Sequence, residues 1–166
     1  MKWKVAILTA SDRCFKGERE DTSAQVIREL VEEELEGEII EYRIVPDEIK
    51  EIMASLIEMT DYYQADLVLT TGGTGLSPRD VTPEATLQVI ERLVPGIAEA
   101  MRMTAMLKSP RAMLSRSVAG IRGQSLIINL PGSPKGVNES LAAIMEQLPH
   151  ALNILTGHQP DHNENK

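Results

Sequence analysis

Short segments rich in apolar residues, each with the length of a strand, alternate along the first half of the chain with segments in which apolar residues recur every three or four positions. The strand-like segments lie at 5–9, 39–45 and 66–70. The run at 5–9 is continuously apolar, which is typical of a strand buried on both faces. Between them, residues 21–35 and 48–63 have the spacing of helices with one apolar stripe. Strands that alternate with helices predict an α/β fold with a mostly parallel sheet.

Residues typical of helix ends support this pattern. Asp21 precedes the first helical segment as a capping residue, and Gly37 is expected to close that segment. A third helix is expected to start at Thr82, with Thr82 as its N-cap, Pro83 at the first helical position and Glu84 in the first turn.

The second half of the chain has a less regular pattern. It predicts a helix over 95–106, two strands over 114–121 and 125–130 around a glycine-containing turn, and a helical region over 137–155 that Pro149 divides.

The length of 166 residues fits one domain with a sizeable core. We predict a three-layer single domain over residues 1–156, with a central mostly parallel sheet flanked by helices, and a polar, disordered tail over 157–166. Cys14 is the only cysteine, which excludes an intramolecular disulfide and favours the reducing cytoplasm. No segment approaches the roughly 20 apolar residues of a membrane span.

The charge of −8 is unevenly distributed along the chain. Residues 18–61 contain 15 acidic and 4 basic side chains, whereas residues 102–135 contain 6 basic side chains and no acidic one. An acidic chain with 3% aromatic residues is a poor nucleic-acid binder, because phosphate neutralisation and base stacking both lack residues. The basic segment suits either a small anionic ligand or an acidic surface of another subunit or domain.

Polar residues follow each of the four proposed strands that would be parallel. They are Ser11 and Asp12, then Asp47, then the glycine loop of Thr71, Gly72, Gly73, Thr74 and Gly75, and finally the later loop of Pro131, Gly132, Ser133, Pro134 and Lys135. The carboxyl ends of parallel strands meet at one edge of a sheet, where ligands bind in open α/β folds. These residues are therefore expected to converge on one rim.

Each of these groups has two interpretations. The glycine loop is either a tight strand-to-helix turn or a nest of N–H groups that holds an anion. Lys135, in the first turn of a helix, is either a solvated side chain or a phosphate ligand. The carboxylates of Asp12, Asp47 and Asp80 are either turn residues or ligands of a divalent metal that is carried by a nucleotide.

Together these segments resemble a known family. TTGGTG at 70–75 followed by RDVTPEA at 79–85 resembles the signature of the MogA/MoaB-type molybdopterin-binding proteins of molybdenum cofactor biosynthesis, which include the G domain of gephyrin. The sequences SDR at 11–13, PDE at 46–48, LSR at 114–116 and PGSPK at 131–135 match in the same order. The resemblance extends from about residue 4 to residue 156.

The resemblance implies the molybdopterin-binding fold, a homotrimer, and an adenylyl transfer. AMP would pass from Mg·ATP to the terminal phosphate of molybdopterin, and pyrophosphate would be released. Because no second catalytic domain is expected here, a separate molybdate-insertion protein would use the product. No nucleic acid or membrane partner is implied.

Residue roles follow from the same resemblance. Asp47 and Asp80 would be the catalytic acids and the ligands of Mg²⁺, and their two roles could be exchanged. Ser11, Asp12, the glycine loop, Ser115, Arg116 and the later loop with Pro131, Gly132, Ser133 and Lys135 would bind ATP and molybdopterin.

Two other functions remain open. The first is a non-catalytic carrier, because some paralogues of the MoaB type lack one or both acids; this chain has both Asp47 and Asp80, which favours an enzyme. The second is the related domain of competence-damage-inducible proteins, which usually accompanies a further domain.

Overall fold

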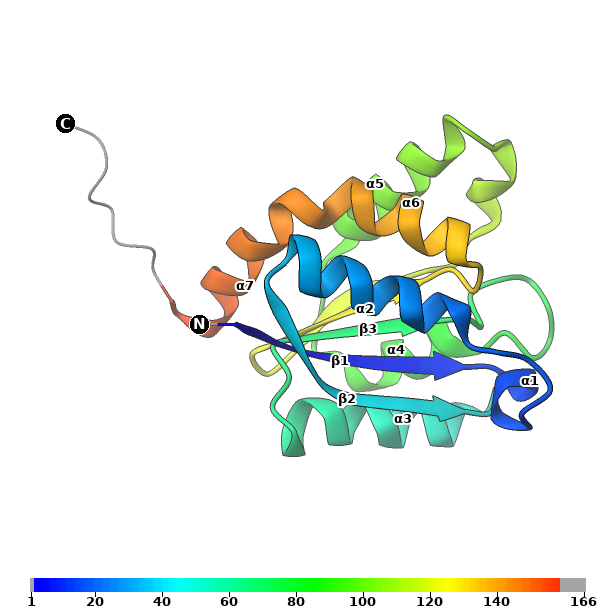
Figure 1. The fold of residues 1–166 in the computed structure, drawn as a ribbon, viewed down its shortest axis with the longest axis horizontal. Coiled ribbons are helices and arrows are strands. Elements are labelled where there is room, and N and C mark those ends of the chain that lie inside the picture. The colour runs from blue at the N-terminus through cyan, green and yellow to red at the C-terminus, as the bar shows by residue number, and fades with distance from the viewer. Residues whose placement is uncertain (1, 159–166) are drawn as a thin grey trace.

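The computed structural model describes residues 2–158, and within them one sheet of six strands runs through the molecule (Figure 1). The strands are β1 (Trp3–Ala10), β2 (Gly37–Val45), β3 (Leu67–Thr71), β4 (Arg92–Leu93), β5 (Ala119–Arg122) and β6 (Ser125–Leu130), in the spatial order β2-β1-β3-β6-β5-β4. β2, β1, β3 and β6 are parallel, whereas β5 and β4 are antiparallel to their neighbours. The prediction of a mostly parallel sheet is confirmed.

Helices cover both faces of this sheet. They are α1 (Asp12–Phe15), α2 (Thr22–Glu34), α3 (Ile49–Ile57), α4 (Thr82–Val89), α5 (Pro95–Met106), α6 (Pro134–Ile144) and α7 (Leu148–Thr156), with a π-helical turn at Glu58–Tyr62 and 3-10 turns at Pro110–Leu114 and Met145–Gln147. α2, α5, α6 and α7 pack on one face, and α3 and α4 pack on the other. The predicted three layers are confirmed, and within residues 2–158 no helix has both the length and the apolar character to cross a bilayer.

One apolar core lies on each face of the sheet, which explains why the central strands are apolar at nearly every position. Ile7 and Leu69 face the α2 side, whereas Leu8 and Val68 face the α3 side. All of β3 and β6 is buried. A strand that is covered on both faces needs apolar residues at every position, and this removes the alternation of a half-exposed strand.

Gly37 does not close α2, contrary to the prediction. Glu36 takes the left-handed conformation with φ 56°, and Gly37 is already the first residue of β2. A Cβ atom on Gly37 would lie 2.5 Å from Cγ1 of Val31. Gly37 therefore serves the close approach of strand and helix rather than the turn itself.

The predicted strand over 114–121 is largely wrong. Residues 110–114 form a 3-10 turn, residues 115–118 have no regular structure, and β5 begins only at Ala119. This irregular segment is held by a distant part of the chain, because the N–H of Arg116 donates to the carbonyl of Thr74 at 2.9 Å. The two-residue strand β4 and the short helix α1 were not predicted, since neither is long enough to show a periodicity.

The division of the last helical region is confirmed, with the break at 145–147 and Pro149 in the first turn of α7. Of the predicted polar tail, residues 159–166 lie outside the described residues.

An ion pair between the end of β5 and the π-helical turn leads to a first prediction. The guanidinium of Arg122 donates two hydrogen bonds to Asp61, at 3.0 and 2.8 Å, and lowers the pKa of that carboxyl. Because the pKa is lower in the folded state than in the unfolded state, this stabilisation is present at neutral pH and is lost as the pH falls through the lowered pKa.

We expect Asp61→Asn to reduce the free energy of unfolding by about 0.5–1 kcal/mol at pH 7, since half of the Asp61 side chain is exposed and the pair is screened by solvent. Denaturant titrations at pH 7 and at acidic pH measure this. A loss of the same size at acidic pH would contradict an ionic origin.

Candidate functional site

The carboxyl ends of four neighbouring strands meet at one rim of the sheet, on the right in Figure 1. Thr9 of β1 is in register with Thr71 of β3, which pairs with Leu130 of β6, while Ala10 pairs with Val45 of β2. From β1 the chain passes over one face of the sheet to β2 and returns over the other face to β3. The gap between β1 and β3 is thus the topological switch point, where open α/β sheets bind ligands.

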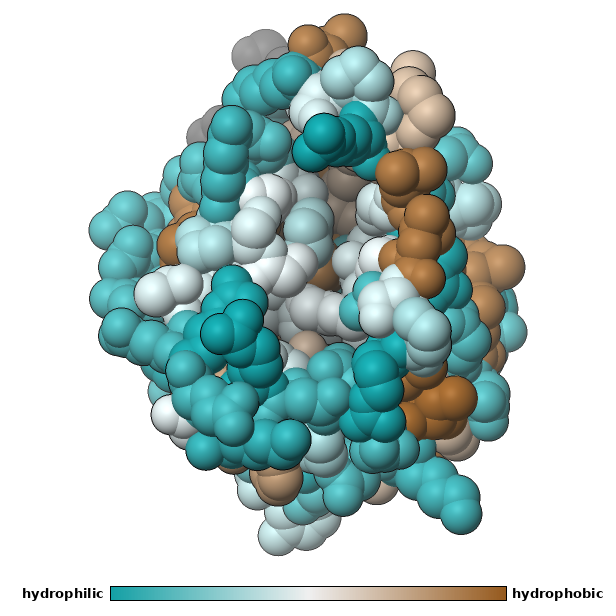
Figure 2. Space-filling model, turned by 90° about the vertical axis from the view of Figure 1, so that its right-hand side faces the viewer, coloured by the Kyte–Doolittle hydropathy of each residue, from teal (hydrophilic) through white to brown (hydrophobic). Residues whose placement is uncertain are grey.

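A pocket of about 360 Å³ lies at this switch point, and Figure 2 shows it as a hollow lined with residues of intermediate hydropathy and surrounded by hydrophilic ones. Of the residues predicted from the sequence, its wall includes Ser11, Asp47, Thr71, Gly72, Gly73, Asp80, Gly132 and Ser133. The predicted convergence of the rim loops is therefore found. What these residues bind stays a prediction.

The glycine loop is shaped by close backbone contacts. Gly72 has φ 92°, and a Cβ atom on it would lie 2.3 Å from the carbonyl oxygen of Ala10. Gly73 has φ 68°, and its Cβ would meet Oγ1 of Thr82 at 2.3 Å. Both positions require glycine for steric reasons alone, so the tight-turn interpretation accounts for them, and an anion site remains compatible.

Thr82 is not the N-cap that the sequence predicted. It is the first residue of α4, and Val81 occupies the cap position without a side-chain hydrogen bond. The hydroxyl of Thr82 instead donates to the carbonyl of Gly72 at 2.9 Å, and its N–H donates to the carbonyl of Gly73 at 3.1 Å. Thr82 therefore fixes the glycine loop against α4.

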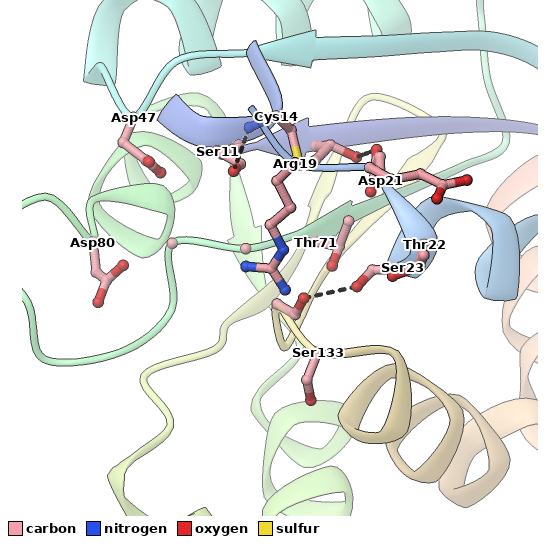
Figure 3. A pocket seen from close by; sticks show the side chains of 16 residues that line it. Ser11, Cys14, Arg19, Asp21, Thr22, Ser23, Asp47, Thr71, Asp80 and Ser133 are labelled. Carbon is pink, nitrogen blue, oxygen red and sulfur yellow. Dashed lines mark hydrogen bonds between the residues drawn. The ribbon is translucent and has the colours of Figure 1, made fainter. Parts of the chain in front are cut away.

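Asp47 and Asp80 come from different loops and lie at the same side of the pocket (Figure 3). Oδ2 of Asp47 accepts the N–H of Asp12 at 3.0 Å, and Oδ1 of Asp12 accepts the N–H of Asp47 at 3.0 Å. Oδ1 of Asp47 is buried without a hydrogen-bond partner in the described part of the chain. Burial raises the pKa of Asp47, and the charges of Asp12 and Asp80 raise it further.

This acid pair fits a cation that arrives with its own ligands. Within residues 2–158, no three His, Cys, Asp or Glu side chains gather into a metal-binding cluster. Mg²⁺ is commonly bound by one or two carboxylates together with phosphate oxygens. The unpartnered oxygen of Asp47 is the acceptor that such an ion would satisfy.

Two of the predicted residues, Asp12 and Arg116, do not line the pocket but contact the loops that carry Asp47 and Asp80. Asp12 accepts two hydrogen bonds from Arg79, at 3.1 and 3.0 Å, and Arg79 lowers its pKa. Arg116 donates to the carbonyls of Gly75 and Asp80, at 2.8 and 2.6 Å, and to Glu84. Both arginines thus hold the loop that carries Asp80.

Other predicted residues lie in a second hollow of about 330 Å³ between α5, the 110–114 turn and α6. Ser115, Pro131 and Lys135 line it, and Ser133 is shared with the first pocket. Arg102 and Arg111 also line this hollow, although the sequence identified them only as members of the basic segment. Thr74 and Gly75 lie in neither hollow and continue the loop between Gly73 and Asp80.

Comparison with known proteins decides the family. The model of the family described as "Probable molybdopterin binding domain" matches residues 6–150. The chain belongs to this family. It is 48% identical over 161 residues to the molybdopterin adenylyltransferase of Helicobacter pylori strain J99, which covers 96% of this chain and 92% of the relative. The Escherichia coli K12 molybdopterin adenylyltransferase is 41% identical over 144 residues, covering 86% of this chain and 74% of the relative.

Solved structures agree with this assignment. The molybdopterin biosynthesis enzyme MoaB of Thermus thermophilus is 52% identical, with a TM-score of 0.89, and covers 95% of this chain and 98% of its own. The resemblance seen in the sequence is therefore confirmed for the molybdopterin-binding family and for its fold. The relatives carry both adenylyltransferase and MoaB names.

The main group that the sequence did not identify extends from the end of β1 to the start of α2. The pocket wall also includes Thr9, Ala10, Cys14, Arg19, Glu20, Asp21, Thr22 and Ser23. The sequence showed Asp21 only as a helix cap. A topological signal was available, because in a molybdopterin-binding domain with parallel strands the helix after β1 must begin at the rim where the other loops meet.

Proposed function

We propose that the protein is a molybdopterin adenylyltransferase that transfers AMP from Mg·ATP to the terminal phosphate of molybdopterin. The observation that carries the proposal is the meeting of Asp47 and Asp80, from separate loops, in one pocket beside the glycine loop. Relatives that are 48% and 41% identical and are named for this activity support it.

The chemistry is a displacement at phosphorus. An oxygen of the molybdopterin phosphate attacks the α-phosphorus of ATP, the new P–O bond forms, and the bond to the bridging oxygen of pyrophosphate breaks. Both reactants are anions, so positioning and charge neutralisation contribute more than a strong base. Mg²⁺, when bound, supplies that neutralisation, and Asp47 and Asp80 would hold it.

The remaining residues would position the two anions. Backbone N–H groups of the glycine loop suit one phosphate. Arg102, Arg111 and Lys135 outnumber the one acidic side chain of the second hollow, Glu139, so its net charge is positive and suits the other anionic substrate. Ser133, in the wall of both hollows, lies where the two reacting groups would approach each other.

The setting of the reaction is part of the same proposal. We expect a cytoplasmic homotrimer whose product passes to a molybdate-insertion protein. Exposed apolar side chains on α5 and the following 3-10 turn, namely Met103, Leu107, Met113 and Leu114, support burial against another subunit.

Pyrophosphate release from the purified protein tests the function. With molybdopterin and Mg·ATP we expect release in proportion to adenylylated molybdopterin, and none when molybdopterin or Mg²⁺ is omitted. Binding of molybdopterin without release would identify the carrier instead. Neither binding nor release would overturn the proposal.

A further inference from the structure

We propose that Asp21, held by Thr9 and Tyr42, is a positioning residue for the reaction, acting through the start of α2 and the loop at 131–133. The inference rests on the proposed adenylyl transfer and assigns a role that neither the acid pair nor the glycine loop fills. Figure 3 shows Asp21, Thr22 and Ser23 on the wall of the pocket across from the two acids.

The carboxylate of Asp21 joins three elements. Oδ1 accepts the N–H of Ala24 at 3.2 Å and so caps α2. Oδ2 accepts the hydroxyl of Thr9, on β1, at 2.6 Å and also the hydroxyl of Tyr42, on β2. An N-cap needs only one of its oxygens for the helix, so the second oxygen fixes the helix start to the sheet.

The donors to this carboxylate are themselves held in place. Thr9 is 3% exposed and belongs to a strand paired on both sides. Burial and the neighbouring Asp21 raise the pKa of Tyr42, so its phenol is protonated and donates at neutral pH. Asp21 differs in this from Asp47, one oxygen of which has no hydrogen-bond partner among residues 2–158.

The position of the loop at 131–133 depends on the position of α2. The hydroxyl of Ser23, which is buried, donates to the carbonyl of Gly132 at 2.7 Å. The hydroxyl of Thr71 donates to the carbonyl of Pro131 at 2.6 Å from the other side. The loop that carries Ser133 between the two hollows is therefore held between α2 and β3, and a displaced α2 would move it.

Steady-state kinetics of pyrophosphate release separate this role from simple stability. Asp21→Ala removes the cap and both strand contacts, and we expect kcat to fall at least about tenfold, because displacements of about 1 Å can cost up to about 100-fold. The KM values for ATP and molybdopterin should change by less than about threefold. Tyr42→Phe removes one of the two strand contacts and should lower kcat less, by about threefold.

Two further variants make the test specific. Asp21→Asn keeps an oxygen for Ala24, and its amide can donate to both hydroxyls, so we expect kcat within about threefold of the wild type. Val31→Ala shortens a buried side chain of the same helix that does not line the pocket. It should lower the melting temperature and leave kcat almost unchanged.

An equal loss of kcat in Asp21→Ala and Val31→Ala would overturn the inference. A loss in Asp21→Asn as large as in Asp21→Ala would also overturn it, by showing that the negative charge matters and not the position. If Asp21→Ala does not fold, wild-type kcat in Tyr42→Phe would count against it. A wild type that releases no pyrophosphate would overturn the proposed function itself, and the inference with it.

Discussion

Asp47→Asn is expected to lower the rate of pyrophosphate release roughly 100-fold or more, and Asp80→Asn should act similarly, because removing one preorganised electrostatic contact at a reacting centre commonly costs this much. The amide can still accept the N–H of Asp12, so the hydrogen bond between the two rim loops survives. What is lost is the negative charge beside the place that we propose for Mg²⁺.

Release measured over a range of Mg²⁺ concentrations checks this prediction, and the variants should need more Mg²⁺ for their residual rate. Asp66→Asn is the matched control. Asp66 accepts the N–H of Lys4 at 2.9 Å and directly precedes β3, so it lies at the end of the sheet opposite the pocket. Activity close to wild type in Asp47→Asn would rule out a metal-binding role for this acid.

Gly72→Ala is expected to destabilise the fold by about 3 kcal/mol or more and to abolish pyrophosphate release. A non-glycine residue at φ 92° carries strain of about 1–3 kcal/mol. The added Cβ would also lie 2.3 Å from the carbonyl oxygen of Ala10, which relaxes only if the ends of β1 and β3 move apart. The pocket lies between those two ends.

Gly123→Ala separates the two contributions. Gly123 also has a positive φ, of 58°, but beyond its two chain neighbours no atom lies within 4 Å of its added Cβ, so only the backbone cost of about 1–2 kcal/mol applies. Denaturant unfolding of both variants measures the difference. Equal losses would show that the contact with Ala10 carries no energy.

The sequence was informative where one physical requirement fixes the residue type. β1, β3 and β6 are covered on both faces, and this makes their apolar runs visible. Parallel strands then place their carboxyl ends at one edge, which brought Asp47, the glycine loop and Ser133 together correctly.

The sequence failed where the partner of a residue is distant along the chain. Thr82 has the composition of an N-cap, but its hydroxyl is used by Gly72, ten residues earlier. Asp21 does cap α2, yet its contacts with Thr9 and Tyr42 need the assembled sheet. Residues 115–118 are held by hydrogen bonds between Arg116 and Thr74 and between Val118 and Asn129, which no local propensity could predict.

The pocket is lined by segments that lie between residues 9 and 133 and meet only when β1, β3 and β6 are paired. The unfolded chain therefore retains no part of the site, and any ligand of the pocket binds the folded state alone. By mass action, a ligand at 100 times its dissociation constant adds about 2.7 kcal/mol to the stability of the whole domain. Substrate supply and resistance of this protein to proteolysis are thereby thermodynamically linked.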